Sequence, residues 1–404
     1  MNRSLSHAQT HWSPLYFLVP LGLGGLGVSF FMYPFFWLAH PGAPVPVFED
    51  FLAGFSDGGL ATRAMIVASV AAIALFVTLH VASMVWNIRK YREYVRTPAY
   101  AALRSGNGET QLSVVPLALA MSINVGFVAG LVFVPGLWSI VEYLFPLALL
   151  AFLAVGWYAL TILGDFYGRV LVRGGFDCSR NNSFAQLLPA FALGMVGVGL
   201  AAPAAMSANA TVIAVSYVAS SFFVVAAFIL LIANAVLGMR AMLENGASDE
   251  GAPTLWIVIP ILTVLGIALV RQGDGMRAGF GVDGGATGNF TMLTGFVAVQ
   301  FLAGLLGWRV LRGKRYFARY VFGRERSPAS YALVCPPVAI AVLGHFYINA
   351  GLVGAGVLDR FSLAFWLLSA VAVLAQAAAI YVLVTLNAGH FSAAGALAGP
   401  APAR

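Results

Sequence analysis

The chain has 404 residues, of which 60% are hydrophobic and only 9% are charged, and its formal net charge is +7. A soluble domain carries about 25% charged residues, so this composition excludes the soluble fold classes and predicts an integral membrane protein. The positive charge does not predict a nucleic-acid partner, because Lys and Arg concentrate in a few short connections between apolar stretches.

The chain begins with a polar segment, residues 1–13, which we expect to be a cytoplasmic N-terminus, because the apolar run after it lacks a small-residue cleavage site. Ten later stretches are apolar and close to the roughly 20 residues that a membrane-spanning helix needs. They cover approximately residues 14–38, 62–88, 110–134, 137–163, 184–206, 209–236, 253–270, 290–311, 329–351 and 361–388. We therefore expect an all-α transmembrane domain of ten helices over residues 14–390, followed by a disordered cytoplasmic tail, 391–404, rich in Ala, Gly and Pro.

The basic residues predict the orientation of these helices. Of the 22 Lys and Arg residues, all but four lie at the termini or in connections that follow an even-numbered stretch. Basic residues mark the cytoplasmic side, so we expect both termini to be cytoplasmic. We also expect the membrane to be a bacterial inner membrane. The exceptions on the opposite side are Arg63, Arg271, Arg277 and Arg360. The segment 271–289, with seven glycines, is predicted to be a long mobile loop on that side.

A proline recurs about six residues into each odd-numbered stretch. Proline removes a backbone donor and disturbs the preceding turn, and such a defect is tolerated in a membrane only where it is buried in protein or lines a wet cavity. The pattern predicts five helical hairpins in a quasi-five-fold ring. The inner odd helices are kinked at proline, and the outer even helices face lipid. The five prolines, which we predict to line or gate a pore, are Pro20, Pro116, Pro189, Pro260 and Pro336.

The expected lining of the ring is neutral. The cores of the odd stretches lack Asp, Glu, Lys and Arg, and their polar residues include Ser122 and Asn124. Broken helices also point partial positive charge toward the axis, so a small inorganic or organic anion is the expected passenger. The residues that precede the prolines form a nearly apolar collar suited to gating: Val19, Val115, Leu188, Ile259 and Cys335.

Three short stretches resemble one known family: Leu21-Gly-Leu-Gly-Gly-Leu-Gly-Val28, Ala252-Pro-Thr-Leu-Trp-Ile-Val258 and Tyr331 to Ala341. They are similar to the tellurite-resistance/dicarboxylate transporter family, which includes the TehA proteins and the plant slow anion channels. The resemblance implies a homotrimer in the lipid bilayer, in which each protomer has its own anion pore between five inner helices. It also implies a phenylalanine plug on the ninth helix, and we expect no cofactor.

The chain departs from that family at the plug. Aligning Pro336 with the family's proline places Cys335 where phenylalanine is expected, so Phe346 or Tyr347 is left as the candidate plug. The Cys-Pro-Pro sequence resembles the TsoY branch, whose members often carry selenocysteine. That likeness implies an alternative function, a membrane-embedded redox protein in which Cys335 performs sulfur or selenium chemistry or in which a haem or quinone occupies the cavity.

The buried histidines allow two interpretations. An ionisable group inside a membrane is a functional candidate, so His345 is a candidate pore residue, but a neutral histidine bonded to a neighbouring carbonyl is as good an explanation. Under the redox alternative, His80 and His345 are candidate axial ligands of a haem. Cys335 itself is either a reactive thiol or inert packing. The sequence therefore leaves open whether the protein conducts anions or catalyses a reaction.

Overall fold

The computed structural model describes residues 12–282 and 286–391. Within these ranges the chain is helical and has no strand, and ten helices are long and apolar enough to cross a membrane. The protein is therefore an all-α integral membrane protein with ten candidate spans, as predicted. The predicted tail beyond residue 391 and most of the predicted N-terminal segment lie outside the described residues. The ten spans are Pro14–Trp37, Leu60–Tyr94, Asn107–Phe133, Leu137–Arg173, Phe184–Met206, Ala210–Asn245, Ala252–Phe280, Thr287–Gly313, Pro328–Val353 and Leu363–Phe391.

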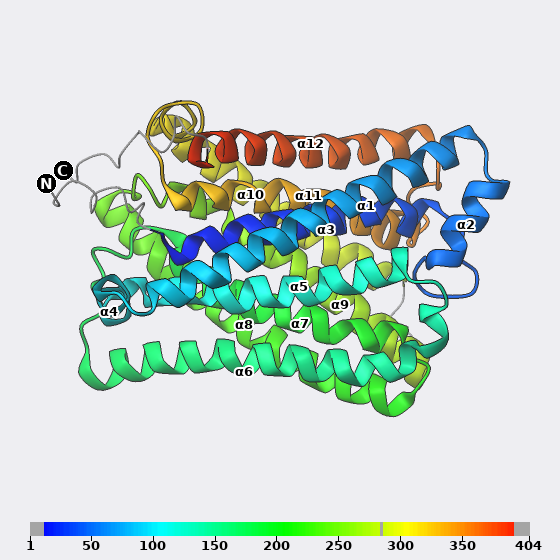
Figure 1. The fold of residues 1–404 in the computed structure, drawn as a ribbon, viewed down its shortest axis with the longest axis horizontal. Coiled ribbons are helices and arrows are strands. Elements are labelled where there is room, and N and C mark those ends of the chain that lie inside the picture. Colours follow the sequence, from blue (N-terminus) through cyan, green and yellow to red (C-terminus); the bar gives the residue numbers. More distant parts are fainter. Residues whose placement is uncertain (1–11, 283–285, 392–404) are drawn as a thin grey trace, which may run out of the picture.

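Ten of the twelve α-helices of the described chain belong to these spans, and two short ones lie at the ends of the bundle (Figure 1). In chain order they are α1 (Leu18–Trp37), α2 (Phe48–Asp57), α3 (Leu60–Tyr94), α4 (Pro98–Ser105), α5 (Val114–Phe133), α6 (Val141–Arg173), α7 (Leu188–Met206), α8 (Ala210–Asn245), α9 (Val258–Phe280), α10 (Ala286–Gly313), α11 (Cys335–Phe346) and α12 (Leu363–Phe391).

The odd-numbered spans lie inside the bundle and the even-numbered spans lie outside. In the most apolar part of each odd span, 56–94% of the residues are buried, against 17–33% in each even span. Each odd span packs against the even span that follows it, giving the hairpins α1–α3, α5–α6, α7–α8, α9–α10 and α11–α12. The outer helices expose large apolar side chains, among them Leu147, Ile229 and Leu374, as a lipid-facing surface requires.

The inner helices pack in a closed cycle. α1 contacts α5, α5 contacts α7, α7 contacts α9, α9 contacts α11, and α11 returns to α1. All five run in the same direction, because each is separated from the next by one outer span. We call the end where the odd spans begin the basic end, because the connections there carry most of the Lys and Arg, and the opposite end the far end (Figure 1, left and right).

The recurring prolines do not interrupt α-helices. Each odd span opens with a short 3-10 segment, and the proline is the second or third residue of the α-helix that follows. A proline in the first turn costs little, because N–H groups there have no α-helical acceptor to lose. Where the sequence predicted a kink in a helix at each proline, the structure instead has a change from a 3-10 segment to an α-helix. The described prolines that do lie within α-helices are Pro34, Pro146 and Pro203.

Serine fixes three of these 3-10 segments. The hydroxyls of Ser13, Ser183 and Ser327 each accept a hydrogen bond from the N–H two residues later, at 3.3–3.4 Å. Such a bond satisfies one of the N–H groups that a helix start leaves without a partner. The repeat seen in the sequence is thus a repeated helix-start device at the basic end.

The prediction of a loop over residues 271–289 is wrong for most of these residues. α9 continues to Phe280, and α10 begins at Ala286. Glycine lowers helix propensity, but here it permits close packing. A Cβ at Gly275 would lie 2.6 Å from the carbonyl oxygen of Ala204 on α7, and a Cβ at Gly279 would lie 2.9 Å from Ile213 on α8. Tertiary contact therefore extends the helix through a sequence that reads locally as a loop.

Candidate functional site: a cavity between the five inner helices

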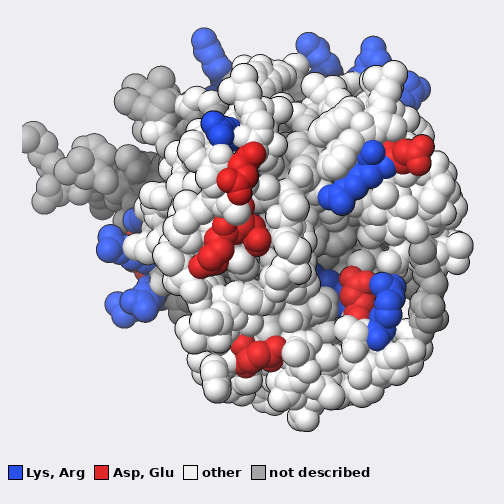
Figure 2. All heavy atoms as spheres, turned by 90° about the vertical axis from the view of Figure 1, so that its right-hand side faces the viewer, with Lys and Arg blue, Asp and Glu red and all other residues white. Residues whose placement is uncertain are grey.

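A cavity of about 230 Å³ lies within the cycle of inner helices. All five inner helices line it, together with Pro44 and Val45 after α1 and two residues of α6. It extends from the level of the recurring prolines toward the far end, where Met206, Arg271 and Asp274 line it. Figure 2 shows the far end of the molecule, which is hollowed near its middle with basic and acidic side chains beside the hollow.

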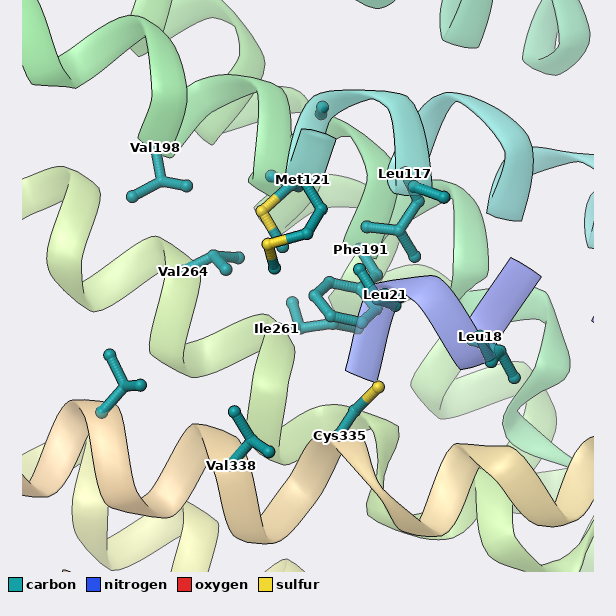
Figure 3. Close-up of a cluster of buried hydrophobic side chains, with 14 of the residues drawn as sticks. Leu18, Leu21, Leu117, Met121, Phe191, Val198, Ile261, Val264, Cys335 and Val338 are labelled. Atoms are coloured by element: carbon teal, nitrogen blue, oxygen red, sulfur yellow. The ribbon is translucent and has the colours of Figure 1, made fainter. Parts of the chain in front are cut away.

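The floor of the cavity, at the basic end, is apolar except for one thiol. Figure 3 shows the Cys335 sulfur pointing from α11 into the space where Leu21 of α1 and Phe191 of α7 also converge. The residues one or two turns nearer the basic end, such as Leu18 and Leu117, are buried and do not line the cavity. The floor residues, one from each inner helix, are Leu21, Met121, Phe191, Pro260 and Cys335.

The floor differs from the collar that the sequence predicts. Val19, Val115, Leu188 and Ile259 are buried outside the lining, and Cys335 alone of that set reaches the cavity. The position that faces the cavity differs between the inner helices. Leu21 follows its proline by one residue and Phe191 by two, whereas Met121 follows Pro116 by five and Cys335 precedes Pro336. Sequence reasoning missed Phe191.

The other predicted pore residues divide into two groups. Asn124 and Phe346 line the cavity, as Pro260 and Cys335 do. Ser122 and His345 do not line it, nor do the remaining four prolines. Tyr347, the second candidate plug, is also outside the lining, and its hydroxyl accepts a hydrogen bond of 3.1 Å from Thr294 of α10.

His80 joins three helices at the level of the prolines. Its Nδ1–H donates to the carbonyl of Pro20 at 2.7 Å, and its Nε2 lies 2.9 Å from Oγ of Ser122. In a neutral imidazole with its proton on Nδ1, Nε2 is an acceptor. The Ser122 hydroxyl has one proton, for which Nε2 competes with the carbonyl of Ala118, also at 2.9 Å. The side chain ties α3 to the start of α1 and to the middle of α5.

His345 lies nearer the far end, in an aromatic setting. Its ring centroid is 5.5 Å from that of Tyr33 and 5.6 Å from that of Trp37, and Phe36 stacks on it at 6.4 Å. Neither ring nitrogen has a hydrogen-bond partner among the described residues, so the expected bond to a neighbouring carbonyl is not formed. The imidazole packs between α11 and α1, outside the cavity.

These positions do not suit a haem held by the two histidines. His80 contacts α1 at Pro20 and His345 contacts it at Tyr33, thirteen residues on, which is about 20 Å at 1.5 Å per residue. A single iron cannot be reached from both. His80 would also have to give up a hydrogen bond to become a ligand.

The functional residue that the sequence did not indicate is Arg271. It was assigned to a loop, but α9 carries it into the cavity lining. Its Nη1 donates to the carbonyl of Val198 on α7 at 3.0 Å, and its other donors have no partner among the residues that the structure describes. A signal existed, because no proline lies between Pro260 and Arg271, but the glycines after Arg271 favoured a loop.

Asp274 lies one turn beyond Arg271 and also lines the cavity. Its carboxylate pairs with Arg277 at 3.4 Å. Within the described lining, Arg271 and Asp274 are the charged residues, and the neutral polar ones are Asn124 and Thr263. The cavity is thus an apolar chamber with one guanidinium and one carboxylate near its far end.

The two cysteines do not meet. Cys335 is buried at the cavity floor, whereas Cys178 is exposed in the connection between α6 and α7 at the basic end, and both are free. A disulfide requires Cα atoms within about 7 Å, which these locations do not offer without a large rearrangement.

No protein-family model matches the chain, and no curated protein matches it either. The comparisons therefore add nothing to the description of the chain as a ten-span membrane protein. A proposal about its function has to be based on the geometry of the cavity.

Proposed function

We propose that the protein is an anion channel or transporter of the slow-anion-channel type, in which the cavity of each protomer is part of the pathway. The observation that carries the proposal is Arg271, the basic residue of the described cavity lining, with most of its donors unpaired in an apolar chamber. A guanidinium in such surroundings attracts an anion strongly, because the low dielectric weakens the electrostatic interaction far less than water does. The closed cycle of inner helices supports a quasi-five-fold ring around the pathway.

The apolar floor is the proposed gate. Leu21, Phe191 and Cys335 come together where the cavity ends, and a narrow apolar constriction blocks ions by excluding water. Phe191 on α7 takes the role that the family resemblance assigns to a phenylalanine on the ninth span. The proposal includes membership in the tellurite-resistance/dicarboxylate transporter family, a homotrimer in a bacterial inner membrane, and a cytoplasmic basic end, following the positive-inside rule.

The test uses Cys335 as a reporter in the purified protein, reconstituted in planar bilayers. In a Cys178→Ser background, we expect anion current that falls when a small methanethiosulfonate reagent reacts with Cys335. The additional change Cys335→Ala should preserve the current and remove the sensitivity. Absence of anion current from the wild-type protein, or current that ignores the reagent in the Cys178→Ser protein, would contradict the proposal.

A redox function that uses Cys335 is the second candidate, and its support is that the thiol faces the cavity. The location of Cys178 outside the bundle gives Cys335 no resolving thiol, which weighs against it. This candidate predicts no anion current from the wild-type protein or from Cys335→Ser, and loss of a thiol-dependent activity in the latter. A visible absorption spectrum of the purified protein tests for a bound haem.

A further inference from the structure

The class of anion that fits the cavity can be inferred from its lining. The first feature is the edge of the Arg271 guanidinium that has no hydrogen-bond partner among the described residues. The bond to the Val198 carbonyl uses Nη1. The Nε–H and one Nη2–H lie along another edge of the guanidinium and point in parallel, which is the geometry that holds both oxygens of a planar oxyanion. A carboxylate head therefore fits the free edge better than a spherical halide does.

The charge balance favours a single negative charge. Arg271, Asp274 and Arg277 together carry one net positive charge, since the carboxylate of Asp274 pairs with Arg277. A monoanion neutralises this group. A dianion would leave one uncompensated negative charge in an apolar chamber, where desolvation is costly.

The neutral polar groups of the cavity cannot hold a second carboxylate. The amide nitrogen of Asn124 donates to the carbonyl of Ala120 and faces the sulfur of Met195. The Thr263 hydroxyl lies 3.1 Å from the carbonyl of Ala339, to which it donates, and it accepts from Gln300. Their donors are thus already used, and beyond Arg271 the side chains of the described lining offer an anion no free donor except the Cys335 thiol at the floor.

The remaining lining is suited to a short hydrocarbon tail. From Arg271 toward the floor the cavity is lined by side chains such as Val198, Val264 and Ile267. Its volume of about 230 Å³ is below the 300–1,000 Å³ typical of sites for drug-sized ligands, so the occupant is small.

We propose that the cavity binds a short-chain monocarboxylate, with its carboxylate held along the Nε/Nη2 edge of Arg271 and its alkyl tail directed toward the apolar floor. This inference rests on the proposed anion function and narrows it to one substrate class. In this proposal Arg271 selects planar monoanions, and the negative charge of Asp274 disfavours dianions.

The test measures binding by the melting temperature of the full-length protein in detergent, with butyrate, nitrate, chloride, sulfate and succinate at equal ionic strength. Butyrate should raise the melting temperature in a saturable manner, nitrate less so because it lacks the tail, and succinate and sulfate should have no effect. Stabilisation by succinate or sulfate equal to that by butyrate would overturn the substrate class.

Variants locate the site. Arg271→Gln should abolish the butyrate effect, and Arg271→Lys should weaken butyrate binding about tenfold or more, because the charge remains while the two-donor edge is lost. Arg63→Gln, at the same end of the molecule but outside the cavity lining, should bind butyrate as the wild type does. A butyrate effect that survives in Arg271→Gln would place the site elsewhere and overturn the inference.

Asp274→Asn should change binding in the opposite direction. Removing this negative charge one turn from Arg271 should tighten butyrate binding on the order of tenfold and allow succinate to bind. Unchanged butyrate and succinate binding would contradict the role assigned to Asp274.

Bilayer currents separate the two proposals. Absence of current with every anion rejects the anion pathway, whereas current carried by chloride or succinate in preference to butyrate rejects only the monocarboxylate inference.

Discussion

The apolar cavity floor, which we propose as the gate, depends on single side chains. Phe191 is 3% exposed and converges with Leu21 and Cys335. We expect Phe191→Ala to increase anion current several-fold, because it removes the largest apolar group from the constriction. The change should also cost about 3 kcal/mol of stability. Phe365→Ala, on the outer helix α12 and equally buried, is the matched control: it should lose similar stability and leave the current unchanged. Equal currents in the Phe191 variant and the wild type would exclude Phe191 as the gate.

A second residue-scale prediction concerns Glu109, whose side chain is 3% exposed. Its carboxylate pairs with Arg104 at 3.1 Å and with Arg169 at 3.0 Å, which fastens the segment before α5 to α6. Removing Glu109 leaves Arg104 and Arg169, whose side chains are 41% and 21% exposed and still reach water, so no buried charge is stranded. The lost charge-assisted hydrogen bonds should cost about 2 kcal/mol, and Glu109→Ala should lower the melting temperature in detergent. Glu93→Ala breaks an exposed pair with Lys90 and should change stability by about 0.5 kcal/mol or less. Similar melting temperatures for the two variants would show that the Glu109 pairs are not stabilising.

At the scale of one residue, the sequence predicted what depends on composition and missed what depends on packing. Asn124, Phe346 and Cys335 were predicted near the pathway because they lie on apolar inner helices, and each lines the cavity. Arg271 was missed because the glycines that follow it have low helix propensity, and no local pattern shows that Gly275 packs against the backbone of α7. Phe191 was missed because the position that faces the cavity, counted from the proline, differs between the inner helices.

At the scale of helices and connections, the sequence predicted the spans and their inner and outer arrangement, since both follow from hydropathy and from the spacing of prolines. It did not predict that the prolines start α-helices. That distinction has a measurable consequence. Pro189→Ala should reduce stability by less than about 1 kcal/mol, chiefly through the unfolded chain, because no hydrogen bond is missing at this position.

Pro203, by contrast, lies inside α7 and leaves the Gly199 carbonyl without its helical partner. Because Pro203 and Gly199 both line the cavity, Pro203→Ala should restore that bond, straighten the helix and change the anion current. The measurements are melting temperature and bilayer current for both variants. A gain of stability from Pro189→Ala, as expected where a missing hydrogen bond is restored, would indicate that Pro189 interrupts a continuous helix after all.

One connection at the basic end predicts a pH dependence. Lys314 and Arg319 donate to the carboxylate of Asp249 and hold its pKa below the ordinary value of 3.8. A group with a lowered folded-state pKa stabilises the protein above its ordinary pKa, and that contribution is lost as the pH falls through the lowered value. The contribution is modest because the side chain is half exposed. Asp249→Asn should therefore lower the melting temperature slightly at pH 7, and the difference from the wild type should vanish at pH values well below 3.8. A difference that persists unchanged in acid would exclude this ion cluster as its source.

For the whole molecule, the decisive feature is that one chain closes the cycle of inner helices by itself. The proposed function therefore assigns one anion pathway to each protomer, whatever the number of protomers in the assembly. No feature of the cavity indicates the number of protomers, and the trimer is implied only by the family resemblance.

Mixed assemblies test this consequence. Protomers with Cys335 and protomers with Cys335→Ala, both in the Cys178→Ser background, are co-expressed in varied ratios and purified through a tag on each type. Under the proposed function each protomer conducts through its own cavity, so the fraction of the current that remains after methanethiosulfonate treatment should equal the fraction of resistant protomers. A pathway shared between protomers would instead lose current as soon as one protomer was modified, so the residual current would fall as a power of the resistant fraction. A linear relation supports separate pathways, and a steeper one rejects the assignment of the pathway to the cavity.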